Sequence, residues 1–194
     1  MPSTASAAAP KVDPASFRDP DGFVFRAPEG ALYRQINRSY EADYRELRAS
    51  GLYDELVKDE LLVPHEEVGL SHAVTDDACQ VIRPRELPFV SYPYEWSFSA
   101  LRDAALLTLE VQKRALNAGL SLKDASSYNV QFEGVRPIFI DTLSFERYRP
   151  GGPWNGYNQF CRHFLAPLAL MAYTDIRLGR LLMQHLDGVP LDLA

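Results

Sequence analysis

The sequence lacks any long apolar run and has little cysteine, and each absence excludes a class of protein. No uninterrupted apolar stretch approaches the ~18 residues of a membrane-spanning helix, and the longest candidates are 104–107 and 164–172. The two cysteines, Cys79 and Cys161, lie far apart and do not have the spacing of a metal site. We therefore expect two reduced thiols in a cytoplasmic protein that has no membrane partner.

The chain also lacks an excess of positive charge. It has 194 residues, with 20 Lys and Arg against 26 Asp and Glu, which gives a net charge of −6. A mildly acidic chain does not produce the electrostatic field of a nonspecific nucleic-acid binder, so no nucleic-acid partner is expected. The hydrophobic share of 46% is that of an ordinary globular domain, and a small-molecule substrate remains open.

Large apolar side chains are almost absent from residues 1–20, which are rich in Ala, Ser and Pro. A secretory signal would need a positive start and an apolar core of about 7–15 residues, whereas the first positive residue here is Lys11. A segment that buries so little area cannot offset its chain entropy. The composition therefore predicts a disordered tail over residues 1–20.

Residues 21–92 show mixed patterning and predict a small lobe of strands and helices. Alternating apolar residues over 23–25 and 31–36, on either side of a Pro-Glu-Gly turn, indicate two short strands. Helical spacing follows from Ser39 and is interrupted at Gly51. Two later stretches, 79–82 and 88–92, are also expected to be strands.

Residues 93–194 predict a mainly helical lobe that contains one β-hairpin. A long helix is expected between a capping Ser97 or Ser99 and a terminating Gly119. One face of this helix contains Leu101, Ala105, Leu109, Gln112 and Leu116, with Ala104, Thr108 and Val111 beside them. The hairpin is expected over 129–141, and a helical region over 154–185 that bends at Pro167. This order gives an α+β fold class. Because the last residues are apolar and end without a polar tail, we expect the lobe to be truncated at its C-terminal end.

One group of polar residues within this lobe is a candidate catalytic site. Asp124 and Asn129 have D-x-x-x-x-N spacing after the long helix, and Asp141 ends the second strand of the hairpin. This order resembles the catalytic-loop region of protein-kinase-like and aminoglycoside-phosphotransferase-like folds. The resemblance implies a catalytic role for Asp124, Mg²⁺ ligation by Asn129 and Asp141, and a Mg-nucleotide cofactor. Arg34 is the nearest candidate cation for the nucleotide.

The same residues also permit a purely architectural interpretation. Leu122 stands where those families carry a histidine, and the chain has neither a glycine-rich phosphate loop nor a lysine on its early strand. Asp124 would then hold its own loop through backbone amides, and Asn129 would cap the strand. Asp141 would pair with Arg136. Similarly, His163 in the last helical region is expected to be a hydrogen-bonded partner rather than a metal ligand.

A second resemblance covers nearly the whole chain after the tail. The segments GALYRQIN (30–37), SYPYEWSF (91–98) and FCRHFLAPLALM (160–171) are similar to the N-terminal region of bacterial class I SAM-dependent methyltransferase-type proteins, including a nodulation-associated one. In that family the methyltransferase domain lies further along the polypeptide. The resemblance implies S-adenosyl-L-methionine as the cofactor of the full-length protein. This chain is not expected to bind it, since no strand followed by a D-x-G-x-G turn is present.

Three functions therefore remain open. The first is an accessory module of a methyltransferase-type protein, with a substrate-recognition or scaffold role and the downstream domain as its partner. The second is a small-molecule phosphotransferase that uses Asp124, Asn129 and Asp141, and the third is a non-catalytic interaction module.

An aromatic series at alternate positions, Tyr92 to Phe98, is expected to be strand core, with base stacking as the alternative.

Overall fold

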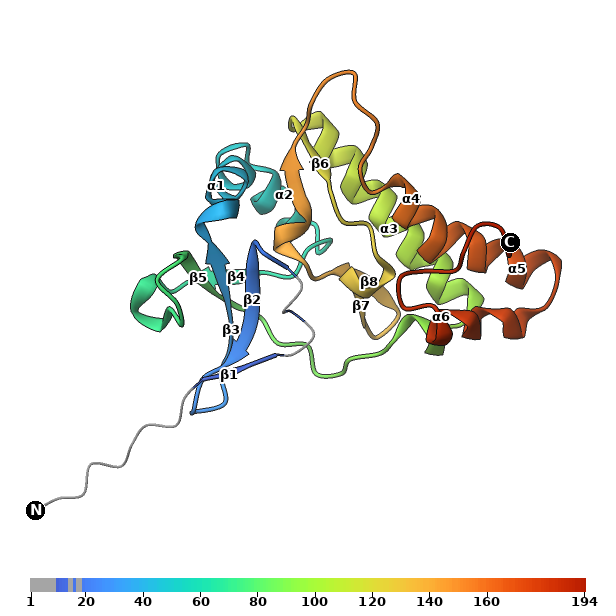
Figure 1. Ribbon diagram of the computed structural model, residues 1–194, viewed down its shortest axis with the longest axis horizontal. Helices are drawn as coiled ribbons and strands as arrows, with labels where there is room; N and C mark the ends of the chain where they lie inside the picture. The colour runs from blue at the N-terminus through green and yellow to red at the C-terminus, as the bar shows by residue number, and fades with distance from the viewer. Residues whose placement is uncertain (1–9, 14–15, 17–18) are drawn as a thin grey trace, which may run out of the picture. The chain divides into compact units, whose positions relative to one another are not determined.

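The computed structural model describes residues 10–13, 16 and 19–194 (Figure 1). They form two compact units, of which the first comprises Pro64–Glu86 and the described residues up to Arg45. The second unit comprises Glu46–Val63 and Leu87–Ala194. Antiparallel strands and helices are both abundant in the chain, as the predicted α+β class requires.

The first unit is built on a five-stranded antiparallel sheet in the order β1-β2-β3-β5-β4. Its strands are β1 (Lys11–Val12), β2 (Gly22–Arg26), β3 (Leu32–Asn37), β4 (His65–Glu67) and β5 (Ala78–Pro84). The predicted hairpin of β2 and β3 turns at Gly30, whose φ of 92° favours glycine. Phe25, Tyr33 and Val81 form the buried centre of this sheet.

The range predicted for the disordered tail, residues 1–20, includes residues that are part of the sheet. Lys11–Val12 pair with Phe25–Arg26 at the sheet edge, and the Asp19 carboxylate lies 3.1 Å from the Arg34 guanidinium. An edge strand gains its hydrogen bonds from backbone groups, so this pairing needs no large apolar side chain. The remainder of the predicted tail, at residues 1–9, 14–15 and 17–18, lies outside the described part of the chain.

The second unit is centred on helix α3 (Phe98–Asn117). The helix begins as predicted, because Ser97 Oγ accepts a hydrogen bond from the amide of Ala100 at 3.2 Å. Leu109 and Leu116, which the sequence pattern places on one face with the buried Leu101, are 41% and 42% exposed. Besides Leu101 and Leu107, the buried face of α3 contains smaller and polar residues: Ala104, Ala105, Thr108, Val111, Gln112 and Ala115.

Two small antiparallel pairs of strands lie beside α3 (Figure 1). One joins β6 (Leu120–Leu122) to β9 (Phe145–Arg147), and the other joins β7 (Val130–Glu133) to β8 (Arg136–Phe139). The β7–β8 pair confirms the predicted hairpin. The amide of Val63 donates to the carbonyl of Phe139 at 2.8 Å, and the amide of Phe139 donates to the carbonyl of Leu61 at 2.9 Å.

These backbone bonds explain why the units do not follow the predicted division at residues 92 and 93. The predicted first lobe contained residues 46–63, but here this segment is part of the second unit. It includes helix α2 (Leu52–Lys58) and the end of α1 (Glu41–Ala49). Four of its leucines, Leu47, Leu52, Leu56 and Leu62, are buried in the same core as α3, and Leu61 is partly buried against it.

The expected strand over 88–92 is wrong, because this segment is a loop that leads into the short η4 turn (Pro93–Glu95). A side chain takes the place of a neighbouring strand. Gln131 Oε1 accepts from the amide of Ser91 at 2.9 Å, and Gln131 Nε2 donates to the Ser91 carbonyl at 3.0 Å. The aromatic series is consequently not a strand, and the Tyr92 and Tyr94 rings stack with centroids 5.4 Å apart.

The C-terminal helical region is broken into short pieces. They are α4 (Tyr157–Phe160), a π-helical turn η7 (Cys161–Leu165), α5 (Ala166–Tyr173), η8 (Ile176–Arg180) and α6 (Leu181–Gln184). Pro167 has no N–H to offer the carbonyl of His163, and the wide π turn occurs at this point. Within the described residues, no helix is both long and apolar enough to cross a membrane.

Candidate functional site

The second unit brings Asp124, Asn129 and Asp141 together. Asp124 follows β6, Asn129 ends the short η5 turn (Ser127–Asn129), and Asp141 follows β8. The Asn129 side chain hydrogen-bonds the Asp124 carboxyl, which also experiences the charge of Asp141. Arg34, the fourth predicted site residue, belongs to the first unit, where it pairs with Asp19.

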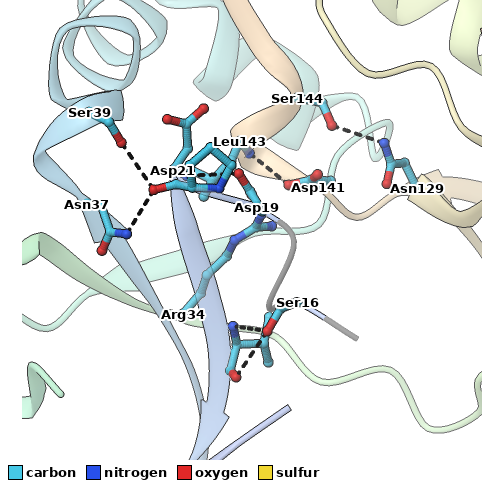
Figure 2. Close-up of polar contacts among 12 residues, drawn as sticks. Ser16, Asp19, Asp21, Arg34, Asn37, Ser39, Asn129, Asp141, Leu143 and Ser144 are labelled. Carbon is cyan, nitrogen blue, oxygen red and sulfur yellow. Dashed lines mark hydrogen bonds and ion pairs between the residues drawn. The ribbon is translucent and has the colours of Figure 1, made fainter. Parts of the chain in front are cut away.

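Both carboxylates serve the turns in which they lie. Asp124 Oδ1 accepts from the amide of Ser126 at 2.9 Å. Figure 2 shows the corresponding bond at Asp141, whose Oδ1 accepts from the amide of Leu143 at 2.9 Å. This geometry is the Asx turn, in which a short acidic side chain replaces a backbone acceptor. One oxygen of each carboxylate is therefore bonded to its own loop.

Asn129 is also bonded within the loop region. Its Nδ2 donates to Ser144 Oγ at 3.1 Å (Figure 2), and its carbonyl accepts from the amide of Ile140 at 2.8 Å. These bonds connect the start of the hairpin to the residues that follow it. The predicted ion pair between Asp141 and Arg136 is wrong. Arg136 pairs with Glu60 instead, with 2.7 Å between Nη1 and Oε2.

The environment of Asp124 favours its protonated form. Burial raises the pKa of this carboxyl above its usual range, and the neighbouring charge of Asp141 raises it further. Hydrogen bonds from Ser126, Gln159 and Asn129 oppose the shift without reversing it. A carboxyl with a raised pKa retains a proton more readily. A raised pKa is also typical of a carboxylate that acts as a general base near neutral pH.

The donor set only partly fits a Mg-nucleotide. Two carboxylates and an amide are hard oxygen donors of the kind that Mg²⁺ prefers. However, the described part of the chain contains no group of three or more His, Cys, Asp or Glu residues placed to hold a metal ion. The turn between β2 and β3 has one glycine, Gly30, and Arg34 is paired with Asp19. These residues therefore match a Mg-nucleotide site only in part.

A buried polar network supports the loop from α3, which the sequence analysis missed. Gln112 Oε1 accepts from the amide of Leu122 at 2.7 Å, and Gln112 Nε2 donates to Ser121 Oγ at 3.1 Å. A glutamine within the apolar face of a long helix is the sequence signal for such a partner, because a buried amide must be hydrogen-bonded.

The C-terminal region, including α4 and the π turn, holds the same loop. Gln159 Oε1 accepts from the amide of Ala125 at 2.7 Å, and Trp154 Nε1 donates to the carbonyl of Leu122 at 2.7 Å. Ser127 Oγ lies 3.0 Å from Nδ1 of His163 in the π turn. The loop that carries Asp124 is thus fixed by side chains from several elements.

His163 is the hydrogen-bonded partner that its helical position predicts. Its side chain is 2% exposed, and burial, with help from the Arg162 charge, lowers its pKa to about 4. The imidazole is therefore neutral at neutral pH. Ser127 is 0% exposed, so its hydroxyl is closed to a substrate, and the pair functions as internal support rather than as a nucleophile with its base.

Comparisons with known proteins give one close sequence relationship. No protein-family model matches the chain. Among solved structures, it is similar to "Structure of vaccinia related kinase 3", with a TM-score of 0.44 and 12% identity over 78% of this chain and 55% of that chain. This weak likeness assigns no function. The chain is 40% identical over 177 residues, 90% of its length, to "Nodulation protein NoeA" of Rhizobium meliloti (strain 1021), and it spans 37% of the length of that relative.

Proposed function

We propose that this chain is an accessory module of a longer, nodulation-associated protein of the methyltransferase type, with a substrate-recognition or scaffold role. The observation that carries the proposal is the 40% identity to NoeA, which extends over 90% of this chain but over only 37% of that relative. A segment with this relationship is expected to act as one part of a larger protein. Such a module would work in the cytoplasm alongside its catalytic partner.

The polar loop supports an architectural role for the three acidic and amide residues. Asp124 and Asp141 each use an oxygen to close a turn, and Asn129 ties the hairpin to Ser144. Because these bonds are satisfied inside the loop, the residues stabilise one loop conformation. A rigid loop of this kind is suited to presenting a surface to a substrate or to another domain.

The sheet topology supports placing the methyl-transfer chemistry elsewhere in the longer protein. Doubly wound dinucleotide-type folds bind their cofactor at the carboxyl edge of a parallel sheet, beside a glycine-rich turn. The three sheets of the described residues pair their strands in antiparallel fashion. We therefore assign S-adenosyl-L-methionine binding to a downstream domain of the same polypeptide, and that domain is this module's proposed partner.

Calorimetric titration with S-adenosyl-L-methionine tests this assignment. The longer protein is expected to bind one equivalent, and this chain none. In the longer protein, removal of residues 1–194 should preserve cofactor binding but lower methyl transfer to the natural acceptor. Stoichiometric cofactor binding by the 194-residue chain would overturn the assignment.

A phosphotransferase is the second candidate, because the structure gathers Asp124, Asn129 and Asp141 in one place. A ligand that binds only the folded state raises the melting temperature. Under the module proposal, Mg-ATP leaves the melting temperature unchanged. A rise of several degrees that Asp141→Asn abolishes, while Asp175→Asn does not, would favour the phosphotransferase instead.

A further inference from the structure

A cavity of about 640 Å³ lies in the second unit, away from the Asp124 loop. It is formed by the η4 turn and Trp96 on one side and by η8 and α6 on the other. Its volume is within the range of small-molecule sites. The lining residues are Tyr94, Glu95, Trp96, Met171, Ile176, Arg177, Gly179, Arg180, Met183 and Gln184.

Most of the lining is apolar and adaptable. Trp96 Nε1 donates to Ser91 Oγ at 2.8 Å, so the polar atom of the indole is already satisfied by the protein. Ile176 and Met183 are 58% and 63% exposed, which leaves large apolar side chains open to an occupant. Methionine and aromatic side chains conform readily to an apolar ligand.

The charged groups of the lining differ in how far they are neutralised. Arg177 is paired with Asp175, with Nε 2.9 Å from Oδ1 and Nη2 2.5 Å from Oδ2. Glu95 Oε2 accepts from the amide of Tyr92 at 2.8 Å. Arg180 is exposed and has no ion-pair partner in the part of the chain that the structure describes. The cavity thus combines apolar walls with an arginine, Arg180, that has no ion-pair partner among the described residues, and with the Glu95 carboxylate, which is bonded to a backbone amide.

We propose that this cavity binds a small amphiphilic anion, whose aromatic or aliphatic body lies against Tyr94, Trp96 and Met183 and whose anionic group pairs with Arg180. A guanidinium binds carboxylate, sulfonate or phosphate oxygens through charge-assisted hydrogen bonds. The assignment rests on the recognition role proposed above and names the ligand class of that role.

Titration with 8-anilinonaphthalene-1-sulfonate, a fluorescent aromatic anion, tests the site. We expect one probe molecule per folded chain. Arg180→Gln should weaken binding about tenfold, the loss of one charge-assisted contact. N-phenyl-1-naphthylamine, which has no sulfonate, should bind Arg180→Gln as it binds the unchanged chain. Equal loss of both probes would contradict an anion contact at Arg180, and no loss of either would contradict the site.

A matched pair of substitutions at the exposed Met183 tests the location. Met183→Glu should abolish binding of the sulfonate probe, whereas Met183→Lys should retain or strengthen it. Leu106→Glu, on an exposed position of α3, is the control for a change in net charge and should have no effect. If Leu106→Glu weakened binding as much as Met183→Glu, the probe would be responding to net charge, and the site would be wrong. The assay involves no methyl transfer, so its failure would contradict the cavity proposal only. The module proposal would still be tested separately by the titration with S-adenosyl-L-methionine.

Discussion

Ser127 Oγ lies 3.0 Å from Nδ1 of His163, and both side chains are buried. The bond joins the loop that carries Asp124 to the π turn of the C-terminal helical region, 36 residues further along the chain. A neutral imidazole is required here because the pair is closed to solvent. The relationship explains how a polar loop is held in one conformation, and it leads to the first two predictions.

His163→Ala should destabilise the protein by about 1–3 kcal/mol, the cost of leaving the buried Ser127 hydroxyl without its partner. The measurement is urea unfolding at pH 7, followed by circular dichroism. His185→Ala is the control, since His185 is only half-buried and should cost much less. Equal losses at the two positions would show that the Ser127 bond contributes nothing specific.

Stability should fall as the pH drops from about 6.5 toward about 4. An unfolded-state histidine has a pKa near 6.5, and the folded-state pKa of His163 is lowered to about 4. Between these values the unfolded chain binds the extra proton and the folded chain does not, so acid favours unfolding. The full effect is about 3 kcal/mol. Unfolding free energies over this range, compared between the unchanged chain and His163→Gln, should differ in slope; identical slopes would contradict the prediction.

Asp124→Asn should cost less stability at pH 7 than Asp124→Ala. Burial raises the pKa of the Asp124 carboxyl, so its ionised form is unfavourable in the folded state, and the cost appears as the pH rises through the unfolded-state pKa near 3.9. The asparagine oxygen can still accept from the amide of Ser126 without a buried charge. Thermal melts of the two variants check the order. A greater loss for the asparagine variant would show that its side-chain oxygen does not replace the carboxylate as the acceptor for the amide of Ser126.

Gln112→Ala should lower the free energy of unfolding by about 1–3 kcal/mol. The substitution removes the acceptor for the amide of Leu122 and the donor to Ser121 Oγ, and both groups lie in the interior. Lys113→Ala is the matched control one residue away, on the exposed side of α3. Chemical denaturation of both variants is the measurement, and a loss below about 0.5 kcal/mol for Gln112→Ala would contradict the network.

Local sequence determined the elements that depend on near neighbours. Ser97 caps α3 through its own hydroxyl, and Gly134, with φ of 63°, turns the β7–β8 hairpin where the pattern places it. Asp124 and Asp141 close Asx turns with residues two positions ahead, and for Asp124 this bonding to backbone amides is the architectural alternative that the sequence offers. In each case the physical cause lies within a few residues, so a pattern in the chain is enough to identify it.

Tertiary packing decided what depends on residues far apart in the chain. The side chain of Gln131 supplies the partners that a strand would have offered to Ser91, so an apparent strand became a loop. Leu109 and Leu116 lie on the exposed side of α3, whereas Leu101 and Leu107 of the same helix are buried. The bond between Ser127 and His163 joins two segments whose spacing carries no pattern. Such contacts are selected by the shape and polarity of the assembled core, and a single sequence does not encode them locally.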